Sequence, residues 1–128
     1  MTPLTKDTKI LIVGLGVIGG SYARALSRNG YSVRCITKEQ KDVDYALLLG
    51  MIEQGSTEVT KETVEWADLV VFALYPHIFI EWIKEYQHLF RAGTLITDVT
   101  GVKSRIVDEV QSILRPDVEF IAAPPLRR

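Results

Sequence analysis

Three glycines with a characteristic spacing stand near the start of the chain. Gly14, Gly16 and Gly19 form a G-x-G-x-x-G pattern directly after the apolar run of residues 10–13. Between a strand and a helix, such a loop lets the backbone approach a phosphate closely, and the helix dipole favours the negative charge. The alternative is a glycine-rich turn that binds nothing. We expect Gly14 to allow the tight turn, Gly16 to leave room for a pyrophosphate, and Gly19 to let the helix pack close to the strand. The expected cofactor-binding residues of this loop are Gly14, Leu15, Gly16, Val17, Ile18 and Gly19.

The residues after the second expected strand bear on which dinucleotide would bind. Domains selective for NAD usually carry an acidic residue there, which binds the ribose 2′-hydroxyl. Here Thr37 takes that place, followed by Lys38, whose ammonium could neutralise a 2′-phosphate or simply be solvated. Glu39 could still serve NAD if the loop folds back. The pattern therefore predicts NAD or NADP and leans to NADP.

Two more segments should lie at the carboxyl ends of strands, where open α/β sheets bind ligands. The first would line the nicotinamide side, or it is only a turn in which a proline starts a helix. It comprises Ala73, Leu74, Tyr75 and Pro76. In the second, Val99 and Thr100 would contact the cofactor. Thr100 is a candidate N-cap with its hydroxyl in the cleft, and it is the one candidate catalytic residue. Lys103 could attract an anionic substrate or pair with Asp98.

Histidine and cysteine offer little further chemistry. His77 is better explained as a residue at a helix start or on the surface, and His88 as a solvent-facing one. Cys35 lies inside an expected strand and is best explained as a small core residue. No cysteine and histidine spacing typical of zinc occurs, so no metal site is expected.

Composition excludes several classes of protein. The 128 residues carry 15 Lys and Arg against 16 Asp and Glu, which argues against a nucleic-acid binder. A single cysteine excludes an intramolecular disulfide. The longest apolar run, residues 10–20, is too short to span a membrane and is broken by four glycines. We expect a cytoplasmic domain that contacts no membrane.

Apolar runs alternate with segments of helical periodicity along the chain. The expected strands are residues 10–13, 32–36, 69–74, 94–97 and 118–122, with a stub at 51–52. The expected helices lie at about 18–29, 42–49, 76–90 and 102–114. Strands that are apolar throughout are typical of a parallel sheet covered on both faces. We predict a doubly wound α/β fold over residues 1–123, with about six strands in the order 3-2-1-4-5-6, as in Rossmann domains.

Three segments together resemble one enzyme family. Residues 14–21, residues 67–73 with Pro76, and residues 96–104 are similar to the amino-terminal domain of prephenate dehydrogenases, and residues 120–123 resemble a strand of that family. The resemblance covers roughly residues 9 to 123. It implies an NAD(P)-dependent oxidoreductase that oxidises and decarboxylates prephenate, or the related arogenate, in tyrosine biosynthesis. Hydride would pass to the cofactor as carbon dioxide leaves and the ring becomes aromatic.

The chain departs from the family pattern at two places. The family usually has a serine where Gly101 stands, and a proton-accepting histidine where Pro124 stands. We interpret residues 124–128 as a short tail outside the pattern, and we expect the family's helical substrate and dimerisation domain to be absent. We therefore expect a truncated, inactive chain that binds the dinucleotide. Its face beyond the last strand should be apolar or should self-associate, and a homodimer is one expected assembly. The alternatives are a stand-alone dinucleotide sensor and a dehydrogenase for another small hydroxy acid.

Overall fold

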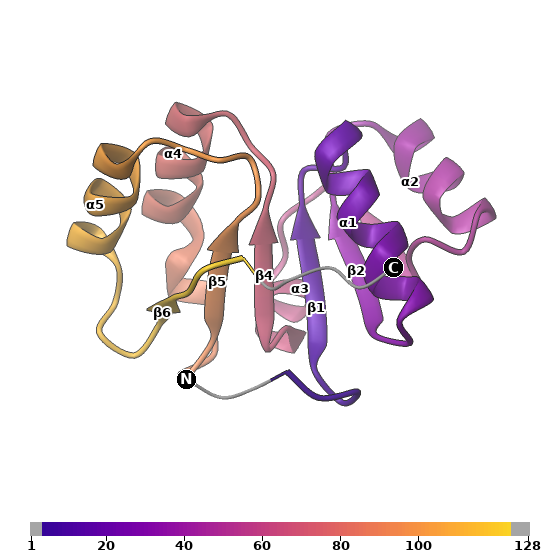
Figure 1. The fold of residues 1–128 in the computed structure, drawn as a ribbon, viewed down its shortest axis with the longest axis horizontal. Coiled ribbons are helices and arrows are strands. Elements are labelled where there is room, and N and C mark those ends of the chain that lie inside the picture. The colour runs from indigo at the N-terminus through magenta and orange to yellow at the C-terminus, as the bar shows by residue number, and fades with distance from the viewer. Residues whose placement is uncertain (1–3, 124–128) are drawn as a thin grey trace.

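The computed structural model describes residues 4–123, which form one sheet flanked by helices (Figure 1). The sheet has six strands, all parallel, in the order β3-β2-β1-β4-β5-β6. This order confirms the predicted doubly wound fold. Strands β1 to β3 are added toward one side of the sheet, and β4 to β6 are added toward the other, starting again beside β1. The strands are β1 (Lys9–Val13), β2 (Ser32–Ile36), β3 (Gln54–Ser56), β4 (Leu69–Phe72), β5 (Leu95–Asp98) and β6 (Glu119–Phe120).

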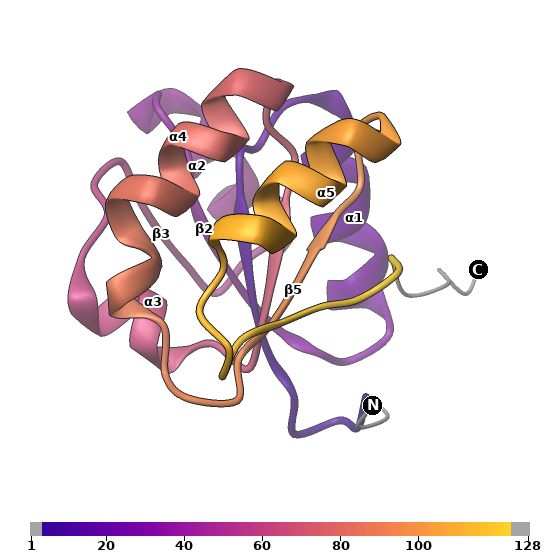
Figure 2. The same ribbon diagram turned by 90° about the vertical axis from the view of Figure 1, so that its left-hand side faces the viewer.

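Helices cover both faces of the sheet. They are α1 (Val17–Arg28), α2 (Gln40–Leu48), α3 (Lys61–Trp66), α4 (Pro76–Tyr86) and α5 (Ser104–Ile113), with a 3₁₀ turn at Gln87–Leu89. One apolar core contains residues of α1 and α2, and the other contains residues of α3, α4 and α5. Figure 2 shows α4 and α5 side by side over their face. Helices on opposite faces follow from right-handed crossovers that run in opposite directions from the centre of the sheet.

The central strands are buried on both faces, as their continuous apolar sequences predict. In β1, Ile10 and Ile12 belong to the core under α1 and α2, while Leu11 and Val13 belong to the other core. All four side chains are at most 3% exposed. Helical layers on both sides are therefore required to shield β1 from water.

The structure corrects several expected elements. Met51 and Ile52 are buried but precede the third strand, which is β3, and the helix α3 was not predicted. The expected helix over 76–90 ends at Tyr86 and passes into the 3₁₀ turn, and the last strand is confined to Glu119–Phe120. These elements are short or polar, so hydrophobic periodicity identifies them poorly.

Exposed large apolar side chains gather elsewhere than expected. Within residues 4–123 none lies on α5 or β6; they stand instead near the glycine loop, on α2 and at the start of α4. Ala122 and Ala123, which follow β6, are exposed but small, so an apolar face beyond the last strand stays a prediction. The expected tail, residues 124–128 with Pro124, lies outside the described residues. Of the helices in the described part, none is long and apolar enough to cross a membrane.

Candidate functional site

The carboxyl ends of the central strands meet at one level along an edge of the sheet. In the strand register Val13 stands opposite both Ile36 and Phe72, and Phe72 stands opposite Asp98. The loops after β1, β2, β4 and β5 consequently begin side by side. Their first residues are Gly14, Thr37, Ala73 and Val99, all predicted to contact a cofactor. The structure thus brings together segments that are far apart in the sequence.

Two glycines of the loop after β1 are required by the fold itself. Gly14 has a φ of +95°, and a Cβ there would lie 2.5 Å from the carbonyl oxygen of Ala73. A Cβ on Gly19 would lie 2.0 Å from the carbonyl oxygen of Gly14. Any side chain at either position would collide with backbone, which cannot rotate away. Gly14 therefore lets β4 approach, and Gly19 lets α1 pack against the end of β1.

Gly16 is different, because no protein atom explains it. Its φ of −78° is accessible to any residue, and a Cβ there would meet nothing within 4 Å. Gly16 is also the N-cap residue of α1, where no side chain caps the helix and the first turn holds no acidic residue. The first amides of a helix lack partners within it, and the space beside Gly16 is open. Bare backbone, open space and unpaired amides are what a phosphate group requires.

The end of β2 is tied to the glycine loop by a hydrogen bond. The backbone N–H of Leu15 donates to the Thr37 hydroxyl at 3.2 Å. Lys38 and Glu39 follow, both exposed, and Glu39 is the N-cap residue of α2 without using its side chain as a cap. Thr37 therefore positions the loop, and the side chains of Lys38 and Glu39 stand in solvent beside it.

The segment after β4 combines a turn with an exposed aromatic ring. Tyr75 is the N-cap residue of α4 and Pro76 is its first residue, as the turn interpretation predicts. The Tyr75 side chain is nevertheless 78% exposed, while Ala73 and Leu74 are half-buried. An exposed ring at the sheet's carboxyl edge remains available to a ligand.

The segment after β5 differs from the prediction. Thr100 is not the N-cap of α5, because the helix begins at Ser104 and its N-cap residue is Lys103. Thr100 donates a hydrogen bond to the carboxylate of Asp98 instead. Lys103 is exposed and forms no ion pair with any residue in the described range. Asp98 was expected only as a strand end or an ion-pair partner, and its contacts with this loop were missed.

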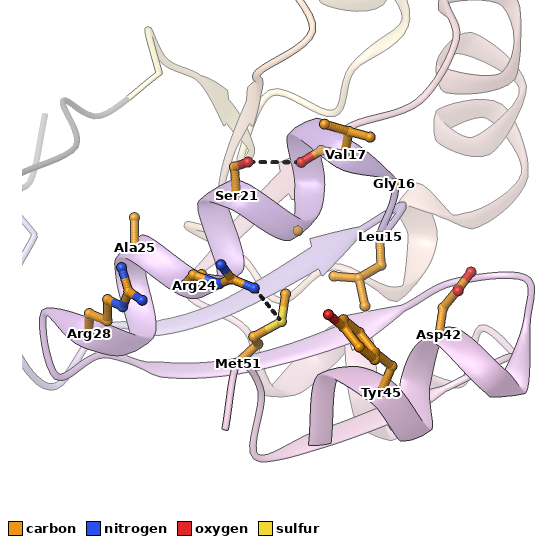
Figure 3. Close-up of a pocket in the computed structure, with 11 residues that line it drawn as sticks. Leu15, Gly16, Val17, Ser21, Arg24, Ala25, Arg28, Asp42, Tyr45 and Met51 are labelled. Atoms are coloured by element: carbon orange, nitrogen blue, oxygen red, sulfur yellow. Dashed lines mark hydrogen bonds between the residues drawn. The ribbon is translucent and has the colours of Figure 1, made fainter. Parts of the chain in front are cut away.

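A groove of about 420 Å³ adjoins the glycine loop between α1 and α2 (Figure 3). Leu15, Gly16 and Val17 form one end of it, and its other members are Gly20, Ser21, Arg24, Ala25, Arg28, Asp42, Tyr45 and Met51. The Arg24 guanidinium points across the groove to the Met51 sulfur, 4.0 Å away. The groove is thus lined by apolar side chains, two guanidinium groups and one carboxylate.

The two histidines and the cysteine have the exposure that the sequence predicts. His77 and His88 are both exposed. Cys35 is fully buried, and burial raises the pKa of its thiol to about 11. No group of three or more side chains able to hold a metal ion occurs between residues 4 and 123.

Comparison with known proteins shows which family this chain resembles in sequence. The family model described as "Prephenate dehydrogenase, nucleotide-binding domain" matches residues 22–127. A prephenate dehydrogenase of Bacillus subtilis is 31% identical over 124 residues, which are 94% of this chain and 33% of that protein. The prephenate dehydrogenase of Lactococcus lactis is 28% identical over 120 residues, 92% of this chain and 34% of that protein. The chain spans about a third of the length of these relatives.

Solved structures agree with the sequence comparison. Prephenate dehydrogenase from Aquifex aeolicus, crystallised with hydroxyphenyl propionate and NAD⁺, matches with a TM-score of 0.79 and 26% identity, covering 91% of this chain and 41% of that one. Synechocystis arogenate dehydrogenase matches 82% of this chain and 37% of its own, with a TM-score of 0.75 and 21% identity. A 3-hydroxyisobutyrate dehydrogenase of Mycobacterium tuberculosis matches with a TM-score of 0.79 and 21% identity, covering 92% and 40%. At 21% identity the last two show the fold alone.

Proposed function

Since the chain belongs to the prephenate dehydrogenase family as its nucleotide-binding domain, we propose that it binds NAD(P) across the carboxyl edge of its sheet. It would be the cofactor half of an enzyme that oxidises and decarboxylates prephenate or arogenate. The Aquifex relative that was crystallised with NAD⁺ supports this cofactor class. The part of the relatives that this chain does not match, about two thirds of their length, is where we place substrate recognition and a homodimer interface. We also propose that the protein is located in the cytoplasm.

Gly16 carries the proposal. Gly14 and Gly19 would be needed in any domain with this packing, so they say nothing about a ligand. Gly16 has no neighbour and no unusual backbone angle, so a ligand is the physical reason left for a missing side chain. A pyrophosphate needs to approach the backbone at this point of the pattern, and a methyl group would occupy its place.

The two halves of the sheet would each hold one nucleoside. The adenosine ribose would lie at the end of β2 near Thr37 and Lys38, and the nicotinamide side would lie by Ala73, Leu74, Tyr75, Pro76, Val99 and Thr100. We propose a preference for NADP, supported by the exposed Lys38 and by the lack of an acidic residue at position 37. The Glu39 carboxylate would repel a 2′-phosphate, but Glu39 is exposed as well, so solvent and salt screen this repulsion.

When bound, the cofactor would accept hydride from the ring carbon that carries the substrate hydroxyl. Thr100 is the residue of this chain that we assign to hydrogen bonding at the reacting side of the cleft. Gly101, which replaces the family's serine, has a φ of +75°, so a serine there would be strained. We propose that the chain alone binds cofactor and does not turn over prephenate.

Gly16→Ala tests the proposal directly. Calorimetry with NAD, NADP and prephenate should show micromolar binding of a dinucleotide to the wild-type chain and no binding of prephenate. The variant should lose at least tenfold in dinucleotide affinity, about 1.4 kcal/mol. Its thermal midpoint should stay unchanged, because the new methyl group meets no protein atom.

Gly20→Ala is the matched control, since a Cβ there makes only an ordinary contact, 3.6 Å from the Met51 methyl carbon. This variant should keep wild-type dinucleotide affinity. Wild-type affinity in Gly16→Ala would refute the placement of the pyrophosphate. A folded wild-type chain that binds neither dinucleotide would refute the proposed function as a whole.

A further inference from the structure

The carboxylate of Asp98 holds the loop that follows β5. Its Oδ1 accepts a hydrogen bond from the Thr100 hydroxyl at 2.7 Å. Its Oδ2 accepts from the backbone N–H groups of Gly101 and Val102, both at 3.1 Å. Three donors, all at most four residues after Asp98, therefore converge on its half-buried carboxylate. Hydrogen bonds to a charged acceptor are stronger than those between neutral groups. Asp98 thus fixes the path of the loop.

This arrangement also decides how the Thr100 hydroxyl can act. A hydroxyl has one proton to donate and two lone pairs that accept. The proton of Thr100 is directed at Asp98, so the hydroxyl oxygen presents only lone pairs to any other group. Thr100 is consequently a hydrogen-bond acceptor toward a ligand.

The loop lies in the half of the sheet that would take the second nucleoside. Asp98 is in register with Phe72 at the end of β4, and the Val99 N–H donates to the Phe72 carbonyl at 3.0 Å. The loop is therefore next to the segment of Tyr75 and away from β2. In a doubly wound sheet the β4 to β6 half binds the nucleoside that the β1 to β3 half does not.

We propose that Asp98 is a positioning residue, which orients the Thr100 hydroxyl as a hydrogen-bond acceptor for the nicotinamide nucleoside half of the cofactor. The proposal rests on the proposed function, since it needs a dinucleotide in the cleft. It adds the direction of the hydrogen bond between Thr100 and the cofactor. The residue types alone leave this direction open, because a threonine hydroxyl that is not bonded to an aspartate could equally donate.

The Asp98→Asn substitution should reverse the hydrogen-bond direction of the Thr100 hydroxyl without changing the conformation of the loop. The side-chain oxygen of asparagine must face the amides of Gly101 and Val102, since its NH₂ cannot accept from them. The NH₂ then faces Thr100 and donates to it, so the Thr100 proton is released toward the cleft. The loop stays in place while the hydroxyl changes from acceptor to donor.

Binding of NAD and of ADP, measured by calorimetry on the intact chain, is the test. ADP contains the adenosine and pyrophosphate but no nicotinamide nucleoside. Asp98→Asn and Thr100→Val should each weaken NAD binding about fivefold, the equivalent of one ordinary hydrogen bond, and leave ADP binding unchanged. Thr100→Ser, which keeps the hydroxyl, should retain wild-type NAD affinity.

The outcomes separate this inference from the proposed function. If the folded wild-type chain binds none of NAD, NADP and ADP, both fail. If the wild type binds both ligands and Thr100→Val leaves NAD affinity intact, the inference alone is overturned. It is overturned as well if Asp98→Asn weakens NAD and ADP binding equally, because a merely structural aspartate would act on both. Thermal midpoints of the three variants report any loss of folding independently.

Discussion

Replacing Gly19 with alanine should separate the packing of α1 from the binding of any ligand. The new Cβ would lie 2.0 Å from the Gly14 carbonyl oxygen, 3.1 Å from the Gly14 carbonyl carbon and 3.2 Å from the Ala73 Cβ. Two of these three atoms are backbone, so no side-chain rotation relieves the clash. The start of α1 must withdraw from the end of β1, although Ala23 and Leu26 hold the rest of the helix against the sheet.

The cost can be worked out from this geometry. Overpacking costs about 1–3 kcal/mol, and a clash with backbone belongs at the upper end of that range. Alanine regains about 0.5–1 kcal/mol over glycine inside a helix, so the net loss of unfolding free energy is about 2–2.5 kcal/mol. At roughly 2.1 cal/mol/K of unfolding entropy per residue, the 128 residues give a fall in Tm of about 8 °C.

Thermal unfolding followed by circular dichroism measures this effect, with Gly20→Ala as the neighbouring control. In the control the Cβ meets only the Met51 methyl carbon at 3.6 Å, so helix propensity alone should raise Tm by about 2–4 °C. The two substitutions are chemically identical and one residue apart, yet they should move Tm in opposite directions. Equal Tm changes in both variants would refute the argument that Gly19 is required by backbone contact.

Two further predictions concern charge and burial. Lys38→Ala should lower the affinity for NADP relative to NAD about fivefold, measured by calorimetry, whereas Lys41→Ala, also exposed, should leave the ratio unchanged; an unaltered ratio in Lys38→Ala would exclude Lys38 as a phosphate partner. Cys35 has a pKa raised to about 11 from 9.0, chiefly by burial, so the unfolded thiol ionises first. The free energy of unfolding should therefore fall as pH rises from 9 to 11, by an amount on the order of 2 kcal/mol. Urea titrations at several pH values should show a flatter dependence in Cys35→Ala, and equal slopes would contradict the assignment.

The strands at the centre of the sheet could be predicted because burial on both faces leaves a strong trace in the sequence. Residues 10–13 of β1 and all of β4 are continuous apolar runs, and their order followed from the alternation with helices and from right-handed crossovers. β3 left no such trace. Its residues Gln54, Gly55 and Ser56 are polar or small, and it is a strand at the edge of the sheet. Gly55 is needed there because a Cβ would lie 2.7 Å from a Val43 methyl carbon, a contact that no local pattern reveals.

The candidate site was predicted by position but not by interaction. The loops after four parallel strands must begin together once the sheet order is known, so the glycine loop, Thr37, Ala73 and Val99 could be assigned to one edge. The partner of Thr100 could not be predicted, because an N-cap and an aspartate contact two residues away suit a threonine equally well. Only the observed start of α5 at Ser104 decides between them.

The glycine pattern combines two kinds of information, which the contacts of each glycine separate. Gly14 and Gly19 are required by the approach of β4 and of α1, and they would be required with or without a ligand. Gly16 alone stands in open space, with backbone angles that any residue adopts. A chain that kept the first and third glycines but had a bulky residue at position 16 should fold as this one does and bind no pyrophosphate. The G-x-G-x-x-G pattern is therefore evidence of a fold at two positions and of a function at one.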